Sequence, residues 1–260
     1  MTRRLAAVFA HPDDDTYGVG GTVGLHADAG IEVTAILATS GDAGRILDPS
    51  LASPRNLGLV REGEDRAAWG ELGVKPAMHF LRHPDGGLQG VPRDELVGRI
   101  AELLAAARPE VVVTFGPDGV TGHGDHIAVG EAATAGFHRA RERSPEDGLA
   151  RLLYVAIPQS RLDRLNAFLR ERGIEPLDPT QPFVPRGVPD ETIAVMVDCS
   201  RVYQRKLEAL RQHRTQGELE DVPYELWPEV LDREAFVLAW PERARGEPVL
   251  SDVFEGLPGA

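Results

Sequence analysis

Histidines and aspartates gather in two short segments that lie far apart in the sequence. Residues 11–15 read His-Pro-Asp-Asp-Asp, and residues 123–126 read His-Gly-Asp-His. Imidazole and carboxylate are the ligands that zinc takes in hydrolases, where three protein ligands leave one position open for water. The first segment alone would more often be a turn and a helix cap, and the second alone would be a moderate signal. The two together indicate a catalytic metal site.

Three of these side chains, His11, Asp14 and His126, suffice to hold the metal. Asp13 and His123 would then lie beside the metal without binding it. The free carboxylate of Asp13 can accept the proton of an attacking water as general base. The imidazole of His123 can donate to a developing oxyanion or to the leaving nitrogen. This division of roles predicts hydrolysis of an amide bond, because zinc lowers the pKa of its water and polarises a carbonyl.

The remaining acidic residues of the two segments are expected to support these groups. We expect the carboxylate of Asp125 to orient His123 and to favour its protonated form. Like charges at residues 13–15 repel unless a cation or a helix N-terminus compensates, and Asp15 is the expected helix cap. Zinc is the expected metal, and ferrous iron accepts the same ligands.

The surrounding sequence predicts the elements that position the two segments. The apolar run 5–10 and the valine-rich run 110–115 are typical of buried strands, and each directly precedes one segment. Further strands are expected over 31–39, 77–81, 152–157 and 193–198, and helices over 17–29, 59–72, 93–107, 125–143, 161–172 and 201–213. This alternation predicts an α/β fold, with a doubly wound, mostly parallel, Rossmann-like sheet, helices on both faces and a C-terminal extension. Because ligand crevices form at the carboxyl ends of parallel strands, both segments are expected to converge on one point.

Length and composition narrow the class of protein. The 260 residues fit a single domain over 1–260. A net charge of −13 argues against nucleic acid or an anionic membrane surface as partner. No apolar stretch approaches the ~20 residues that cross a bilayer, and no secretory signal is recognisable, so a cytoplasmic location is expected. A single cysteine, Cys199, excludes a disulfide framework. The oligomeric state stays open, a homo-oligomer included.

The paired motifs resemble those of the PIG-L (LmbE-like) family of zinc-dependent N-acetylglucosaminyl deacetylases. Supporting similarities run through the chain, at residues 20–22, 39–42, 61–64, 85–87, 206–216 and 252–257. The resemblance implies that His11, Asp14 and His126 bind the metal and that Asp13 is the general base. It further implies that His123 stabilises the transition state.

The same resemblance implies how a substrate would be bound. Asp125 would stand behind the transition-state histidine, Arg61 and Asp85 would contact an N-acylated amino sugar, and Asp42 would line the pocket. Two positions depart from the family pattern. Asp15 stands where glutamate is usual, and Thr121 stands where the mycothiol-pathway deacetylases carry a tyrosine near the oxyanion, which argues against that subgroup.

Alternatives to a sugar deacetylase remain at this point. They are an amidase acting on sugar-thiol conjugates, a non-haem iron oxygenase with a two-histidine, one-carboxylate triad, and a non-catalytic sugar-binding module. Residues 176–189 are rich in proline and predict either an exposed connector or a wall of the pocket. For His213, a structural and a functional role are equally expected.

Overall fold

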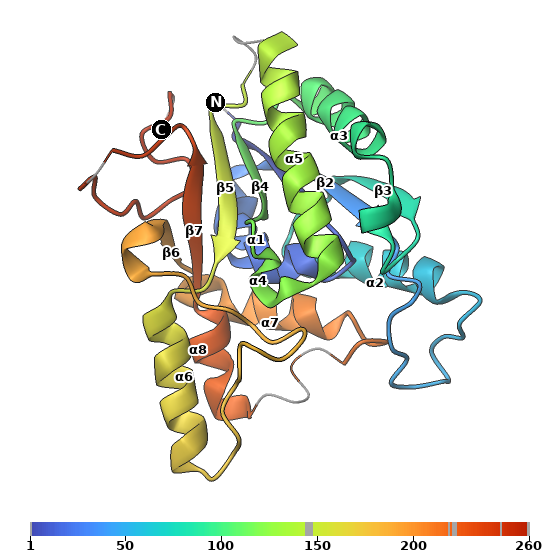
Figure 1. The fold of residues 1–260 in the computed structure, drawn as a ribbon, viewed down its shortest axis with the longest axis vertical. Helices are drawn as coiled ribbons and strands as arrows, with labels where there is room; N and C mark the ends of the chain where they lie inside the picture. The colour runs from blue at the N-terminus through green and yellow to red at the C-terminus, as the bar shows by residue number, and fades with distance from the viewer. Residues whose placement is uncertain (1, 144–147, 218, 220–222, 245, 259–260) are drawn as a thin grey trace.

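A seven-stranded sheet forms the centre of the protein, which we describe from a computed structural model covering residues 2–143, 148–217, 219, 223–244 and 246–258. The strand order is β3-β2-β1-β4-β5-β7-β6 (Figure 1). The strands are β1 (Arg4–Phe9), β2 (Glu32–Thr39), β3 (Ala77–His83), β4 (Val111–Phe115), β5 (Arg151–Ala156), β6 (Ile193–Asp198) and β7 (Arg233–Trp240). The first five are mutually parallel, and β7 is antiparallel to both β5 and β6.

Helices cover both faces of this sheet (Figure 1). They are α1 (Asp14–His26), α2 (Leu57–Glu71), α3 (Arg93–Ala107), α4 (Gly119–Gly122), α5 (Gly124–Arg143), α6 (Gln159–Glu171), α7 (Tyr203–Arg211) and α8 (Trp227–Leu231). On one face α3 packs against α5, and on the other α7 packs against α1 and α2. The expected α/β architecture is therefore confirmed. Within the described residues, no helix combines the length and apolar character that a bilayer crossing requires.

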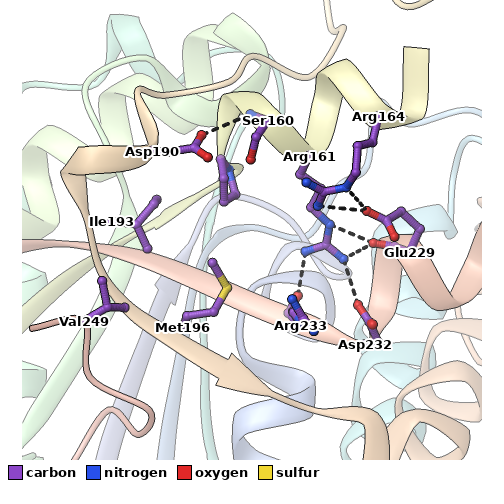
Figure 2. Close-up of a pocket in the computed structure, with 11 residues that line it drawn as sticks. Ser160, Arg161, Arg164, Asp190, Ile193, Met196, Glu229, Asp232, Arg233 and Val249 are labelled. Carbon is purple, nitrogen blue, oxygen red and sulfur yellow. Dashed lines mark hydrogen bonds and ion pairs between the residues drawn. The ribbon is translucent and has the colours of Figure 1, made fainter. Parts of the chain in front are cut away.

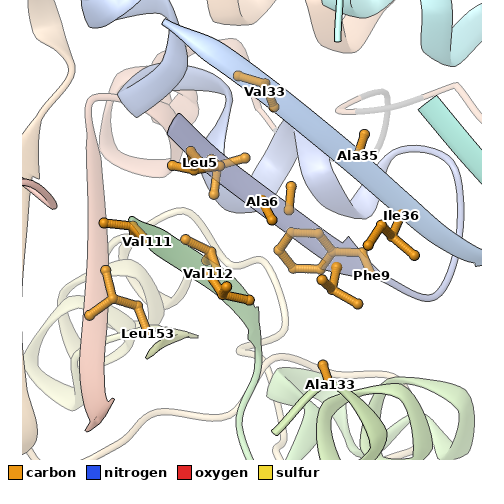
Figure 3. Close-up of a cluster of buried hydrophobic side chains, with 14 of the residues drawn as sticks. Leu5, Ala6, Phe9, Val33, Ala35, Ile36, Val111, Val112, Ala133 and Leu153 are labelled. Carbon is orange, nitrogen blue, oxygen red and sulfur yellow. The ribbon is translucent and has the colours of Figure 1, made fainter. Parts of the chain in front are cut away.

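The core lies on both sides of the central strands (Figure 3). All five residues of β4 are buried, and β1 is buried from Leu5 to Phe9. Because helices shield both faces, these strands need apolar side chains at successive positions rather than at alternate ones. The Phe9 and Phe115 rings meet edge to face with centroids 5.0 Å apart at the carboxyl ends of β1 and β4.

The order of the strands reverses between β1 and β4. From β1 the chain first builds outward through β2 to β3, and it then returns to add β4 on the other side of β1. In open α/β sheets such a reversal leaves a crevice beyond the carboxyl ends of the two strands. Both His/Asp segments follow these two strands, so the fold brings them to the crevice.

One strand of the sheet was not expected from the sequence. The C-terminal extension supplies β7, which is inserted between β5 and β6. Its apolar run, residues 235–240, carries Ala235 and Phe236 into the core. This run begins soon after the short α8 ends, so its apolar residues fit a continuation of that helix as well as a strand. The sequence pattern alone therefore did not predict β7.

Candidate metal centre and active site

His11, Asp14 and His126 converge at the carboxyl ends of β1 and β4. One carboxylate oxygen of Asp14 lies 3.3 Å from Nδ1 of His11, and the other lies 3.4 Å from Nε2 of His126. Ligand atoms of all three lie within 4.8 Å of one another. A second group that meets the same distance limit, His11 with His123 and Asp125, shares His11 and lies beside the first.

The ring of His126 is held so that one nitrogen faces Asp14. Its Nδ1 lies 3.0 Å from the carbonyl oxygen of Gly119. Its ring stacks on Phe115 with centroids 4.0 Å apart. A histidine that donates Nδ1–H to a carbonyl keeps the lone pair of Nε2 for a metal. Gly119 has φ +63°, and a Cβ added there would lie 3.0 Å from that of His126, so this close approach needs glycine.

Three carboxylates surround His11. Its Nε2 lies 3.0 Å from Asp85 and 3.4 Å from Asp125, and its Nδ1 faces Asp14. Burial opposes a charge on this ring, but hydrogen bonds to the carboxylates of Asp125, Asp14 and Asp85 raise its pKa to about 12. Burial likewise opposes ionisation of Asp14, yet His126 and His11 bring the pKa of this carboxyl well below its usual range. The cluster therefore holds positive charge strongly, and its donor set fits a divalent cation.

Asp13 is fixed by Arg61, which rises from the first turns of α2. One guanidinium nitrogen donates to Oδ2 of Asp13 and to the carbonyl of Pro12, both at 2.7 Å, and the other donates to the carbonyl of Gly41 at 3.0 Å. Arg61 is only 4% exposed. The predicted substrate-binding arginine thus holds the predicted base. Asp13 itself has φ 118°, a conformation that non-glycine residues rarely adopt.

The contacts of Asp125 differ from the sequence expectation. Its carboxylate accepts the backbone N–H groups of Gly86 at 2.7 Å and Leu88 at 3.0 Å, and it faces His11. His123 instead accepts the backbone N–H of Asp125 at Nδ1, over 3.1 Å. Burial, followed by the nearby charges of His11 and His126, lowers the pKa of His123. The arrangement favours a neutral ring with its proton on Nε2, where the sequence predicted a protonated one.

The remaining predicted pocket residues lie at different distances from this cluster. Asp85 bridges His11 and the backbone N–H of Ala43, which it accepts at 2.9 Å. Asp42 is exposed on the loop after β2, with its Cβ beside the first turn of α2. Thr121 accepts the backbone N–H of His123 at 3.4 Å through its hydroxyl. The structure thus places Asp85 against His11, and it leaves Asp42 exposed on its loop.

The proline-rich segment 176–189 lies against the site. The ring of Phe183 approaches the His123 ring at 5.0 Å while staying 65% exposed. The backbone N–H of Arg186 donates to the carbonyl of Val120 at 2.7 Å. The segment therefore touches the His123 loop, and its role as an exposed connector or as a wall of the pocket stays a prediction.

Sequence reasoning missed a group of buried polar residues behind the cluster. Asp15 was the expected helix cap, but it is fully buried and accepts the indole N–H of Trp69 at 2.8 Å. Burial raises its pKa to about 6, and burial together with the charge of Asp15 raises the pKa of the neighbouring Asp65 carboxyl well above its usual range. Asp65 lies one helical turn after Arg61, and this spacing could have placed the two side chains on one face of α2. His213 is buried here as well and contacts Thr16 at 3.0 Å.

A separate pocket of about 470 Å³ lies between α6, α8 and β6 and shares no lining residue with the cluster (Figure 2). Arg161 crosses it to donate to the carbonyls of Glu229 and Arg233 and to Asp232. Arg164 pairs with the carboxylate of Glu229 at 3.2 Å. These contacts tie α6 to α8 and β7, so the pocket's arginines serve the packing of helices.

Comparison with known proteins adds relatives to this geometry. The family described as GlcNAc-PI de-N-acetylase, PIG-L, matches residues 6–137. The 1D-myo-inositol 2-acetamido-2-deoxy-alpha-D-glucopyranoside deacetylase of Geodermatophilus obscurus is 33% identical, and the alignment covers 99% of each chain.

Two solved structures share the fold. The conserved protein TT1542 from Thermus thermophilus has a TM-score of 0.63 at 23% identity, covering 94% of this chain and 97% of that one. The N,N'-diacetylchitobiose deacetylase from Pyrococcus horikoshii has a TM-score of 0.60 at 22% identity, covering 91% of this chain and 83% of that one.

Proposed function

Because the chain belongs to the PIG-L family, we propose that it is a metal-dependent deacetylase that hydrolyses the N-acetyl amide of an N-acetylglucosamine-type sugar. The observation that carries this proposal is the convergence of His11, Asp14 and His126 within 4.8 Å, directly beside Asp13. A doubly wound sheet with deacetylase relatives favours this reading over an iron oxygenase or a binding module. An amidase acting on sugar-thiol conjugates would need the same centre and differs only in its substrate.

The proposed ligands are His11 through Nδ1, Asp14 through its carboxylate and His126 through Nε2. A zinc ion there would lower the pKa of its water and polarise the amide carbonyl. Zinc is the proposed metal, and ferrous iron is the alternative that metal analysis of the purified protein distinguishes. Asp85 and Asp125 hold Nε2 of His11, which fixes the ring and increases the basicity of its other nitrogen.

The proton chemistry falls to two residues of the chain. Asp13 accepts the proton of the attacking water, and Arg61 keeps its carboxylate in place at 2.7 Å. The Nε2–H of His123 donates a hydrogen bond to the oxygen on which charge develops. Asp13, which has taken the proton of the water, passes that proton to the nitrogen of the departing amine. Since His123 donates from the neutral state, its lowered pKa does not impair this role.

The proposed substrate is inferred from the named relatives and from the side chains that lie around the cluster. The named relatives act on an acetamido-glucopyranoside of inositol and on diacetylchitobiose. We propose an N-acetylated amino sugar, with Asp85, Arg61 and Asp42 toward the sugar side and Phe183 offering an apolar face to the group attached to it. Thr121 stands where the mycothiol-pathway deacetylases carry a tyrosine, so the identity of the group attached to the sugar stays open.

The biological unit is proposed on the same basis. We propose one domain over 1–260, because β7 of the C-terminal extension is inserted between β5 and β6 of the same sheet. A cytoplasmic location suits the buried free thiol of Cys199, since thiols stay reduced there. Light scattering on the purified protein measures whether it is a homo-oligomer.

A panel of N-acyl amino sugars, assayed for amine release together with metal stoichiometry, tests the function. Asp13→Asn should bind metal nearly as the wild type does and lose activity on the order of 10²-fold or more, because the general base is gone. His126→Ala should lose the metal. Wild-type turnover by Asp13→Asn would refute the assigned roles, and inactivity of the metal-loaded wild type on every sugar would refute the function.

A further inference from the structure

His213 is a buried histidine that the proposed chemistry does not use. It follows α7 and is 1% exposed. Its Nε2 lies 3.0 Å from the hydroxyl of Thr16, in the first turn of α1. Its other ring nitrogen, Nδ1, is buried without a hydrogen-bond partner among the described residues.

Arg61 carries the matching unsatisfied group. Its two terminal nitrogens serve Asp13, Pro12 and Gly41, but its Nε is buried and has no partner in the described part of the chain. A buried polar group left unpaired costs about 1–3 kcal/mol. Nε–H of Arg61 is a donor, and Nδ1 of His213 is an acceptor when the Nε2 proton is donated to Thr16. Each group is therefore what the other lacks, and one buried water between them would satisfy both.

The charges agree with this pairing. Burial, and after it the charge of Arg61, lower the pKa of His213 to about 3, so the ring is neutral throughout the physiological range. The turn that carries His213 also lies beside the guanidinium, because a Cβ added at Gly44 would lie 2.6 Å from Nη1 of Arg61 and 3.0 Å from Oε1 of Gln216. A neutral ring beside a guanidinium accepts a hydrogen bond at no cost in charge repulsion.

The turn that carries His213 is anchored to the walls of the site. Thr215 donates its hydroxyl to Glu64 of α2 at 2.7 Å, and its backbone N–H reaches the same carboxylate at 2.9 Å. Gln216 donates its amide to the carbonyl of Arg45 at 2.9 Å. The turn thus joins α1, α2 and the loop after β2, which are the three segments that Arg61 also bridges.

From these contacts we infer that His213 is a positioning residue for the reaction, with Nδ1 holding Nε–H of Arg61 through one buried water so that the guanidinium fork keeps Asp13 in place. Only the kinetic consequence rests on the proposed function. The hydrogen bond itself can be measured without a substrate.

Two substitutions separate the two ring nitrogens. In His213→Asn the side-chain oxygen can occupy the position of Nδ1, and in His213→Gln the side-chain amide can occupy the position of Nε2. If Nδ1 acts through Arg61, His213→Asn should keep most of kcat, and His213→Gln should lose kcat on the order of tenfold with little change in KM, since a hydrogen bond to a charged group is lost. The reverse order, or equal losses, would overturn the inference. His138→Asn, on α5 against Trp240, is the matched control and should behave as the wild type.

A double-mutant cycle tests whether the effect passes through Arg61. In an Arg61→Lys background, which removes Nε–H, His213→Gln should cause no further loss of kcat. Additive losses would refute the coupling. Metal stoichiometry and the urea midpoint should be followed in every variant, so that a folding or loading defect is recognised.

The NMR signal of the Arg61 Nε–H group gives a readout without turnover. It should be protected from solvent exchange in the wild type and in His213→Asn, and it should exchange faster in His213→Gln. Rapid exchange in the wild type would refute the hydrogen bond. If no sugar is hydrolysed but this order of protection holds, the proposed function fails while the positioning contact stands.

Discussion

Asp13 combines an unusual backbone conformation with the role of proposed base. Its φ of 118° is sterically unfavourable for a side chain, and such residues cost about 1–3 kcal/mol when the surrounding structure imposes them. The hydrogen bonds of Arg61 to Asp13 and Pro12 impose it here. Strain of this kind aims the carboxylate at the cost of stability.

The strain can be measured by comparing Asp13→Gly with Asp13→Ala. Both variants lose the carboxylate and should be inactive, but only glycine adopts this φ freely. Asp13→Gly should therefore be more stable than Asp13→Ala by about 1 kcal/mol in urea unfolding, after the greater chain entropy of glycine in the unfolded state is offset. Equal stability of the two variants would show that no strain is stored at this residue.

Gly41 makes room for the guanidinium of Arg61. It has φ +65°, and a Cβ added there would meet the terminal nitrogen of Arg61. Gly41→Ala should displace Arg61, destabilise the fold by about 1–3 kcal/mol and lower kcat at least tenfold, because Asp13 loses its anchor. Gly30→Ala is the control, since Gly30 has a similar φ of +76° but open space around it. Similar kinetics for the two variants would mean that this contact does not position the base.

At the scale of elements, α1 is held from outside by a buried ion pair. Nζ of Lys206, on α7, donates to the carbonyl of Tyr17 at 2.9 Å and to Glu234, on β7, at 2.6 Å. Glu234 also accepts the backbone N–H groups of Gly21 at 2.7 Å and Thr22 at 2.8 Å. The pair thus fixes the middle of the helix whose first turn carries Asp14, a proposed metal ligand.

Replacing one partner of this ion pair should lower the stability of the fold more than replacing both partners by neutral side chains. Lys206→Met leaves the charge of Glu234 buried without its cation, which should destabilise the protein by about 3–5 kcal/mol. The double variant Lys206→Met/Glu234→Gln should lose less than the sum of the two single variants, since no uncompensated charge is left. Urea unfolding of all four proteins measures the coupling. Strict additivity would mean that the two side chains act independently.

Local sequence patterns predicted those parts of the structure that depend on neighbouring residues. The buried runs before residues 11 and 123 gave β1 and β4, and the order of the strands then brought the His/Asp segments together. Contacts between residues far apart in the sequence left no local pattern from which they could be predicted. Asp125 meeting His11, Arg61 meeting Asp13, and His213 meeting Thr16 join segments about 50 to 200 residues apart, and such pairs follow from packing rather than from periodicity.

The whole molecule carries a net charge of −13, and the metal cluster concentrates carboxylates around one imidazole. In the metal-free protein the pKa of His11 rises from 6.5 to about 12, against the opposing effect of burial, because Asp125, Asp14 and Asp85 bind its protonated form. A raised pKa in the folded state contributes stability that is fully present below pH 6.5 and is lost as the pH rises toward 12. The proton thus occupies the position that we propose for the metal.

Metal and proton therefore compete for His11, and the competition makes the effect of metal on stability depend on pH. Binding of zinc at pH 7 should release about one proton from His11, which calorimetric titration in two buffers of different ionisation enthalpy measures. The stabilisation that zinc confers in urea unfolding should grow between pH 6.5 and 8 by up to about 1.4 kcal/mol per pH unit. His126→Ala, which keeps His11 and its carboxylates but lacks a ligand, should show little zinc-induced stabilisation at any of these pH values. A zinc effect independent of pH, with no proton released, would show that His11 is not protonated in the free protein and that the carboxylates around it serve the metal alone.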